Sequence, residues 1–229
     1  MKLSFFPLLI LPLVGLVACA GESRMTLPVL AATQDESVAK ACAAVFPRGR
    51  WQFIHAIEFS QAGGSGSTVL GVTSLDGDEI GCALMTSEGF TLFTAVAKAD
   101  GGLEVRRAVP PFDRPGFAEG LMRDVRMIFL PPSAAKVRYG RLADKTPVCR
   151  YTGAEGRITD ILPGEDGCWR INSFSPDAVR DRALVGRSCR GVGDVQVPGY
   201  LELQGFAPRG YTLKMTLVNP ENLNPNMRQ

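Results

Sequence analysis

One histidine, His55, sets the limit on the acid–base chemistry that this chain could perform. A hydrolase with a serine or cysteine nucleophile needs a base beside the nucleophile and a third group that orients the base. His55 lies in a stretch of alternating polarity, and it shares the apolar face with four residues: Trp51, Phe53, Ile57 and Phe59. We therefore expect a core histidine with a hydrogen-bond partner, or a polar group that touches a ligand inside the domain, and we do not expect an enzyme.

The other residue types that could take part in catalysis or binding are spaced as expected for turns and core positions, and they form no recognisable site. The cysteines are scattered singly, without the Cys/His spacing of a zinc site. The acidic pairs Asp76/Asp78 and Glu165/Asp166 lie beside glycines, where solvated turn residues are expected. The glycine-rich stretch 63–67 lacks the lysine of a phosphate-binding loop and precedes no helix, so it predicts a flexible hairpin. We expect neither a metal nor a cofactor.

The stretch 78–130 predicts the unit around which the rest of the fold is organised. Short apolar strands separated by glycine-containing connections predict an antiparallel meander: Glu79–Thr86, Phe90–Ala97 and Leu103–Ala108. Prolines then end the pairing, and Asp113 or Arg114 before Pro115 predicts a helix start with proline in the first turn. Pro131–Pro132 ends this helix.

The predicted helix has one strongly apolar face. Five residues fall on that face at helical spacing: Phe117, Leu121, Val125, Ile128 and Phe129. Glu119, Arg123 and Arg126 lie off it. Such a stripe needs a sheet face or a cavity to cover, and the neighbouring strands supply one.

The remaining patterns extend the sheet on both sides of this unit. Residues 35–46 predict a first helix with Val38, Ala41, Cys42 and Val45 on its apolar stripe. We count five strands before the long helix and six after it: 51–59, 68–75, 79–86, 90–97, 103–108, 148–152, 157–162, 168–173, 182–189, 198–206 and 211–218. An antiparallel sheet of this length should curl, and a helix in the concavity would fill it.

The N-terminus combines a charged residue, an apolar run and a cysteine. Residues 1–18 are too short and wrongly flanked for a spanning helix and predict a secretory signal. Leu16-Val17-Ala18-Cys19 resembles the lipobox of bacterial lipoproteins, the alternative being an ordinary signal that happens to precede a cysteine. The resemblance implies that Cys19 is the mature N-terminus and carries acyl chains such as palmitate. Ala20 in place of aspartate favours the periplasmic face of the outer membrane.

Removal of the signal leaves a tether, 19–33, and one domain, 34–229, because no second shift in composition divides the chain. The formal net charge is +2, so nothing predicts a nucleic-acid partner.

With Cys19 lipidated, an odd number of cysteines remains in an oxidising compartment: Cys42, Cys82, Cys149, Cys168 and Cys189. If 168–173 and 182–189 are hairpin neighbours and Ser173 pairs with Arg182, Cys168 lies one diagonal step from Cys189. We therefore predict a Cys168–Cys189 disulfide and consider Cys42–Cys82 as a second pair. The alternative is that all five are buried thiols.

Several of these features together resemble the LolA/LolB family of lipoprotein carriers and receptors: the lipobox, the early helix, the meander followed by a helix, and the ending Val197–Leu203 with Tyr211–Met215. The resemblance implies a mainly β (α+β) fold, an unclosed antiparallel half-barrel of about eleven strands with helices covering the concave face. That face would receive acyl chains. Where the family's receptor presents an exposed apolar residue between its third and fourth strands, this chain has Ser87-Glu88-Gly89, with Phe90 nearby.

The resemblance also suggests where a lipid would lie. The candidates for the lipid cavity are Trp51, Phe53, Ile57, Phe59, Phe117, Leu121, Val125 and Leu213, although such a stripe is equally typical of plain core. Arg106 and Arg107 are candidates for contact with a headgroup or an acidic partner, or they are a solvated strand end.

Two functions remain open. One is an anchored carrier or receptor for lipids or lipoproteins in the cell envelope. The other is a non-catalytic envelope lipoprotein that uses the same fold to bind a periplasmic protein, since fold does not dictate function.

Overall fold

Alternating apolar and polar residues produce one antiparallel sheet, which we describe from a computed structural model that covers residues 25–224 except 62–63, 65, 135, 165, 193–194 and 207–209. In this part of the chain the sheet has 13 strands in the order β1-β7-β8-β9-β10-β11-β12-β13-β2-β3-β4-β5-β6. The edge strands β1 and β6 do not pair with each other, so the sheet is unclosed. The signal, Cys19 and the first part of the tether lie outside the described residues.

The strands are β1 (Ala31–Ala32), β2 (Arg50–Gln61), β3 (Ser67–Asp76), β4 (Glu79–Met85), β5 (Thr91–Ala97), β6 (Leu103–Ala108), β7 (Lys136–Arg141), β8 (Pro147–Thr152), β9 (Ile158–Pro163), β10 (Trp169–Phe174), β11 (Arg180–Val192), β12 (Val195–Gly205) and β13 (Tyr211–Asn222). The helices are α1 (Glu36–Ala43) and α2 (Phe117–Phe129).

The prediction of about eleven strands missed β1 and β7, so the count is corrected to 13 in the described residues. β7 carries three basic residues and has only one buried position, Gly140, which leaves no apolar alternation to detect. It is held by pairing with β8 on one side and with the two-residue strand β1 on the other.

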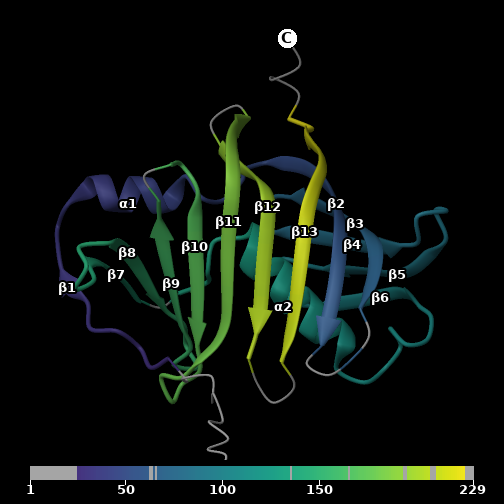
Figure 1. Cartoon of the computed structure of the whole chain (residues 1–229), viewed down its shortest axis with the longest axis horizontal. Helices are drawn as coiled ribbons and strands as arrows, with labels where there is room; N and C mark the ends of the chain where they lie inside the picture. Colours follow the sequence, from purple (N-terminus) through teal and green to yellow (C-terminus); the bar gives the residue numbers. More distant parts are fainter. Residues whose placement is uncertain are drawn as a thin grey trace, which may run out of the picture.

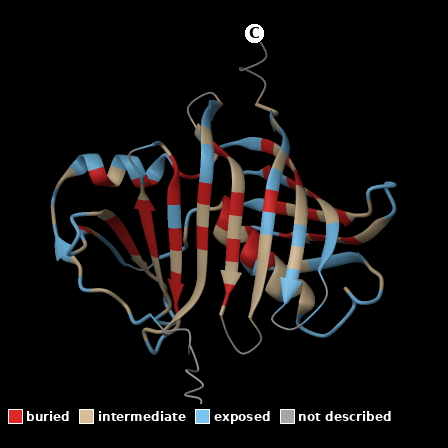
Figure 2. Cartoon of the chain, viewed as in Figure 1, coloured by how far each residue is buried: buried red, intermediate tan, exposed pale blue. Residues whose placement is uncertain are grey.

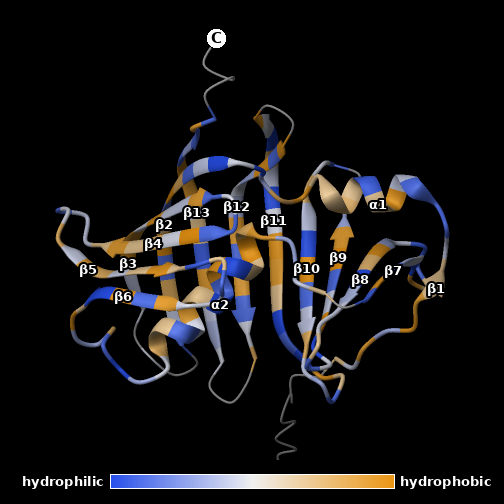
Figure 3. Ribbon diagram, turned by 180° about the vertical axis from the view of Figure 1, so that it is seen from behind, coloured by the Kyte–Doolittle hydropathy of each residue, from blue (hydrophilic) through white to orange (hydrophobic). Residues whose placement is uncertain are grey.

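Strand β13 completes the sheet by pairing with β2, so the last strand lies beside the first long one. The resulting sheet curves around α2 (Figure 1), which lies behind β12 and β13 in that view and in front of them when seen from the other side (Figure 3). Buried residues run along the strands and on α2 (Figure 2). Hence the core lies between the concave face and the helix.

The predicted start of α2 is wrong by a few residues. Pro115 precedes the helix, and the N-cap is Gly116 with a φ of 77°, a left-handed conformation that only glycine adopts readily. The helix ends as predicted, because Leu130 is extended before Pro131. On its inner face Met122, Asp124, Val125, Ile128 and Phe129 are buried.

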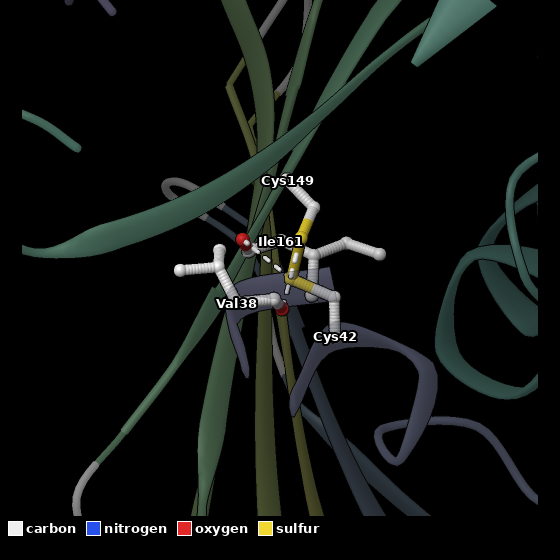
Figure 4. Close-up of a disulfide and its surroundings, with 4 residues drawn as sticks. All are labelled: Val38, Cys42, Cys149 and Ile161. Carbon is white, nitrogen blue, oxygen red and sulfur yellow. Dashed lines mark hydrogen bonds between the residues drawn. A yellow bond between two sulfur atoms is a disulfide. The ribbon is translucent and has the colours of Figure 1, made fainter. Parts of the chain in front are cut away.

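Helix α1 closes the other end of the concave face over β7, β8 and β9. Asp35 caps it by accepting a hydrogen bond from the Ser37 amide at 3.0 Å. The helix is shorter than the predicted 35–46, and Ala41, placed on its apolar stripe, is exposed, whereas Val38 and Cys42 are buried. A Cys42–Cys149 disulfide joins it to β8, and its sulfurs touch the carbonyl oxygens of Val38 and Ile161 at 3.4 and 3.8 Å (Figure 4).

The described part of the predicted tether, 25–33, is bonded to the sheet. The Leu27 amide donates to the Ala178 carbonyl at 2.9 Å, and the Thr33 amide donates to the Tyr139 carbonyl at 2.9 Å. None of residues 25–33 is buried. The segment therefore lies outside the core, as expected, but is ordered by its backbone. Within the described residues no helix is both long and apolar enough to cross a membrane.

Candidate functional site

The interior under α2 is an aromatic cluster built by β2 and the helix. Trp51 stacks on Phe53 with ring centroids 5.4 Å apart, and Phe53 stacks on Phe129 of α2 at 5.1 Å. At the other end of the helix, Phe117 meets Phe93 edge to face at 5.5 Å. The period of two on β2 and the helical period on α2 thus bring their apolar faces together.

The predicted cavity residues lie at different depths. Trp51, Phe53 and Val125 are buried in the core. Four others are partly buried and pack against the same core: Ile57, Phe117, Leu121 and Leu213. Phe59 is half-buried towards the end of β2, 6.4 Å from the Tyr211 ring. Seven of the eight candidates therefore surround one apolar interior, and Phe59 lies at its end.

This interior is filled by side chains. The cavity beneath α2 has a volume of about 20 Å³ and is lined by Val45, Pro47, Phe53, His55, Ile128, Phe129, Trp169, Val195, Gln196, Val197, Pro198 and Leu201. Pockets that hold small molecules have volumes of roughly 300–1,000 Å³. An acyl chain could enter only if α2 or its side chains moved.

His55 is buried, as predicted, but without the expected hydrogen bond. Its side chain is 4% exposed and faces the rings of Phe53 and Phe129, with centroids 6.4 and 6.0 Å away. No hydrogen bond of the imidazole is found among the described residues. Burial lowers the pKa of His55 to about 4, so the ring is neutral at pH 7.

Trp169, at the start of β10, is a site residue that sequence reasoning missed. It is 4% exposed, and its Nε1 has no hydrogen-bond partner among the described residues. The other tryptophan, Trp51, donates from Nε1 to the Arg48 carbonyl at 3.0 Å. The only signal in the sequence was the residue type. A tryptophan in a predicted strand is expected to be buried, and its N–H then needs a hydrogen-bond partner.

A buried carboxylate holds α2 to the sheet. Asp124 is 5% exposed and accepts a hydrogen bond from Arg182 Nε at 2.6 Å. Its second oxygen accepts one from the Tyr211 hydroxyl, and burial, together with this carboxylate, raises the pKa of Tyr211. Sequence reasoning missed Asp124, although it follows Leu121 by three residues and so belongs near the inner face. We call Asp124, Arg182 and Tyr211 the helix clamp.

Tyr211 also lines a second, more polar cavity of about 250 Å³ at the ends of β2, β12 and β13, with Ser60, Gln61, Gln204, Gly205, Phe206, Gly210 and Thr212. Tyr211 of the clamp therefore borders both this opening and the apolar core.

Arg106 and Arg107 lie on the edge strand β6, and both are exposed. Arg106 pairs with Glu104 at 3.1 Å, and the Arg107 guanidinium lies 5.1 Å from the centroid of the exposed Phe90 ring. Both arginines thus lie at a solvated strand end, which is one of the two alternatives that the sequence suggested. Their contact with a lipid headgroup remains a proposal.

The cysteines of the described chain form two pairs and leave one free. Cys168 and Cys189 are joined with an S–S distance of 1.97 Å, which is the pair that the hairpin register predicted. The alternative pair Cys42–Cys82 is wrong, because Cys42 bonds Cys149. Cys82 is buried and free, and burial raises the pKa of its thiol to about 12. Across the described chain, no group of three or more His, Cys, Asp or Glu residues could hold a metal ion.

Comparisons with known proteins identify the architecture. No protein-family model matches the sequence, and no curated protein does. Among solved structures, a LolA superfamily protein from Nitrosomonas europaea superposes with a TM-score of 0.51 at 10% sequence identity, covering 86% of this chain and 98% of that one. The chain has a LolA-like fold.

Two further solved structures are similar. An outer membrane lipoprotein-sorting protein domain from Vibrio parahaemolyticus has a TM-score of 0.49 at 10% identity, covering 83% of this chain and 94% of its own. A DUF1329 family protein from Desulfovibrio piger has a TM-score of 0.48 at 9% identity, covering 82% and 92%. At 10% identity, the superposition on the Nitrosomonas europaea protein shows the fold alone. The predicted fold class, an unclosed β half-barrel with helices on its concave face, is confirmed.

Proposed function

We propose that this LolA-like domain binds acyl chains between α2 and the concave face of the sheet, as a carrier or receptor for lipids or lipoproteins of the bacterial envelope. The observation that carries the proposal is the continuous apolar interior formed by β2 and α2, in which Phe53 stacks on Phe129 at 5.1 Å. The LolA superfamily protein from Nitrosomonas europaea has the same fold, with a sheet of this kind around its interior, and the proposal is consistent with that fold.

Binding requires α2 to move outward, because the cavity of about 20 Å³ is too small for an acyl chain. Two connections flank α2, and their described residues, 109–116 and 130–134, belong to no helix or strand, so movement of α2 need not break the strand pairing. Within the described residues, side chains of α2 make polar contacts with the sheet and its turns through the helix clamp and through a hydrogen bond from Arg126 to the Lys98 carbonyl at 3.1 Å. Movement therefore disrupts few polar contacts.

The free energy gained by burying an acyl chain exceeds the cost of separating the ion pair that holds α2. Burial of about a dozen methylenes at about 0.8 kcal/mol each stabilises the complex by on the order of 10 kcal/mol. Separation of one buried ion pair costs about 3–5 kcal/mol. The acyl chain would also replace the apolar contacts that α2 loses.

Substitutions inside and outside the interior test the location of the ligand. Phe53→Gln and Leu121→Gln should weaken binding of an uncharged fluorescent apolar probe by about tenfold or more, because each puts an unpaired amide into the interior. Lys214→Gln, at an exposed position of β13, is the matched control and should leave binding unchanged. Equal effects of all three substitutions would rule out this interior as the site.

Anchoring through Cys19 is a separate part of the proposal. Several acyl chains at this residue would hold the protein to the outer membrane more firmly than one chain. Radioactive palmitate should label the wild-type protein and leave Cys19→Ser unlabelled. Equal labelling of both would mean that Cys19 is not the acylated residue.

The second candidate function is a non-catalytic interaction module of the envelope. The filled interior favours it, since a cavity of about 20 Å³ is what a packed core leaves and is too small for an acyl chain without movement of α2. The exposed Phe90 under Arg107 would then be part of the surface for a periplasmic partner.

A further inference from the structure

Two polar side chains line the small cavity beneath α2. Trp169 and His55 are each 4% exposed, and both belong to the cavity lining. Trp169 Nε1 is fully buried and has no hydrogen-bond partner in the described structure. The imidazole of His55 also makes no hydrogen bond to the described residues, although its nitrogen atoms are not fully buried. Buried polar groups are nearly always hydrogen-bonded, so the unpaired indole N–H beside the imidazole indicates a group that is supplied from outside the chain.

Packing alone does not explain Trp169. Phenylalanine would fill an apolar site without an indole N–H that must be desolvated. Trp51 shows the usual solution, because its N–H donates to the Arg48 carbonyl at 3.0 Å. Trp51 and Trp169 therefore differ in whether the indole N–H has an acceptor within the protein, and the N–H of Trp169 is the group that a ligand would satisfy.

The position of the cavity connects it to the proposed acyl site. Its wall includes Phe53 of β2 together with Ile128 and Phe129 of the last turn of α2. The remaining wall comes from the connection after α1, the start of β10, and β12. The cavity is therefore the polar end of the apolar interior, and an outward movement of α2 would enlarge it.

The available donors define the chemistry of the missing group. An indole offers one N–H donor, and a neutral imidazole offers one donor and one acceptor. Burial keeps His55 neutral, since its pKa is lowered to about 4. No lysine or arginine lines the cavity, so it does not suit a free carboxylate or a phosphate. An uncharged carbonyl oxygen fits the donors and the neutral lining.

We propose that the carbonyl oxygen of an acyl ester accepts a hydrogen bond from Trp169 Nε1–H, with His55 as a second polar partner, so that the domain selects esterified acyl chains over plain hydrocarbon. The inference rests on the proposed function, because the ester reaches this cavity only if its chain lies in the interior under α2. The selection amounts to about one net hydrogen bond, a three- to tenfold difference in affinity.

The test compares methyl decanoate with dodecane, two ligands of similar length of which only the first has a carbonyl group. Each displaces an uncharged fluorescent probe from residues 19–229 carrying Cys19→Ser, a chain that retains every described residue. The wild-type interior should bind the ester about three- to tenfold more tightly. Trp169→Phe should abolish the preference for the ester while keeping the affinity for dodecane. His55→Leu should reduce the preference for the ester.

Lys214→Gln, at an exposed position of β13 outside the interior, is the control and should retain both the preference and the affinity for dodecane. A second measurement does not depend on the folding of Trp169→Phe, because it uses the protein with both tryptophans present. Its nitrogen-15 spectrum has two indole N–H signals, and the one that remains in Trp51→Phe is assigned to Trp169. This signal should move downfield when methyl decanoate is added and much less when dodecane is added.

The failures are distinguishable. If dodecane displaces the probe but the ester is bound no better, or Trp169→Phe keeps the preference, the ester inference is wrong and the acyl-chain proposal stands. A single water in the cavity would give this result. If neither ligand displaces the probe, both proposals fail.

Discussion

At the scale of single residues, His55 couples stability to pH. It is the one histidine of the chain, and burial lowers its pKa from 6.5 to about 4. Between these values the unfolded chain binds a proton that the folded protein does not, so stability falls as the pH decreases through this window.

We expect the free energy of unfolding to decrease by about 2 kcal/mol between pH 7 and pH 5 through His55 alone. Urea denaturation at the two pH values measures it. His55→Leu should remove this part of the pH dependence, and an unchanged dependence would mean that the imidazole is accessible to protons in the folded state.

A second residue-scale prediction concerns Arg150 and Asp160, a buried pair across β8 and β9. Arg150 Nε and Nη2 donate to the two carboxylate oxygens at 2.7 and 2.6 Å. Asp160→Ala leaves a buried guanidinium without its partner and should cost about 3–5 kcal/mol of stability in chemical denaturation. The exposed pair Arg50–Asp76 is the control, and Asp76→Ala should cost less than about 1 kcal/mol. Similar losses would contradict the burial of Arg150.

Sequence patterns predicted burial better than they predicted partners. The alternation around Phe53 and the helical spacing of Val125 and Ile128 correctly gave buried faces. The partners of Asp124 lie 58 and 87 residues away, on β11 and β13, and no local pattern reports such distances. For the same reason the Cys168–Cys189 pair, within one hairpin, was predictable, whereas Cys42–Cys149 was not.

At the scale of elements, the position of α2 depends on the helix clamp. Asp124→Ala removes the acceptor of both Arg182 and Tyr211, which should weaken the closed position of the helix. We expect faster binding of the apolar probe in stopped-flow mixing, by about fivefold or more, and lower stability. Glu119→Ala, on the exposed side of α2, should change neither property. Identical probe kinetics for Asp124→Ala would show that the clamp does not limit access.

Helix α1 depends on its disulfide. The Cys42–Cys149 bond spans 107 residues and the Cys168–Cys189 bond spans 21. In the chain-entropy description, loss of the longer loop destabilises by about 5 kcal/mol and loss of the shorter by about 3 kcal/mol. Paired Cys→Ser variants compared by thermal unfolding should show this order. The reverse order would mean that α1 contributes little to the cooperative core.

At the scale of the whole molecule, local meanders were predictable and their closure was not. Strands β2 to β6 and β8 to β13 follow one another along the sequence, and glycine-containing turns mark most reversals, with Ser175–Val179 between β10 and β11 marked by Pro176 and Asp177 instead. The pairing of β13 with β2 joins distant segments, and the edge pair β1–β7 lacks an apolar pattern. Likewise, the concave face was predictable, whereas the depth to which α2 fills it depends on how the side chains pack.

Native mass spectrometry of residues 19–229 with Cys19→Ser, purified from a bacterial envelope without added detergent, tests the acyl-chain proposal most directly. The proposal predicts a fraction of protein with an added mass equal to an acylated lipid, which is released when the protein is unfolded. It also predicts that Phe53→Gln reduces this fraction. A protein that is repeatedly empty, and that also fails to bind an apolar probe, would contradict the proposal and leave the interaction module as the function of this fold.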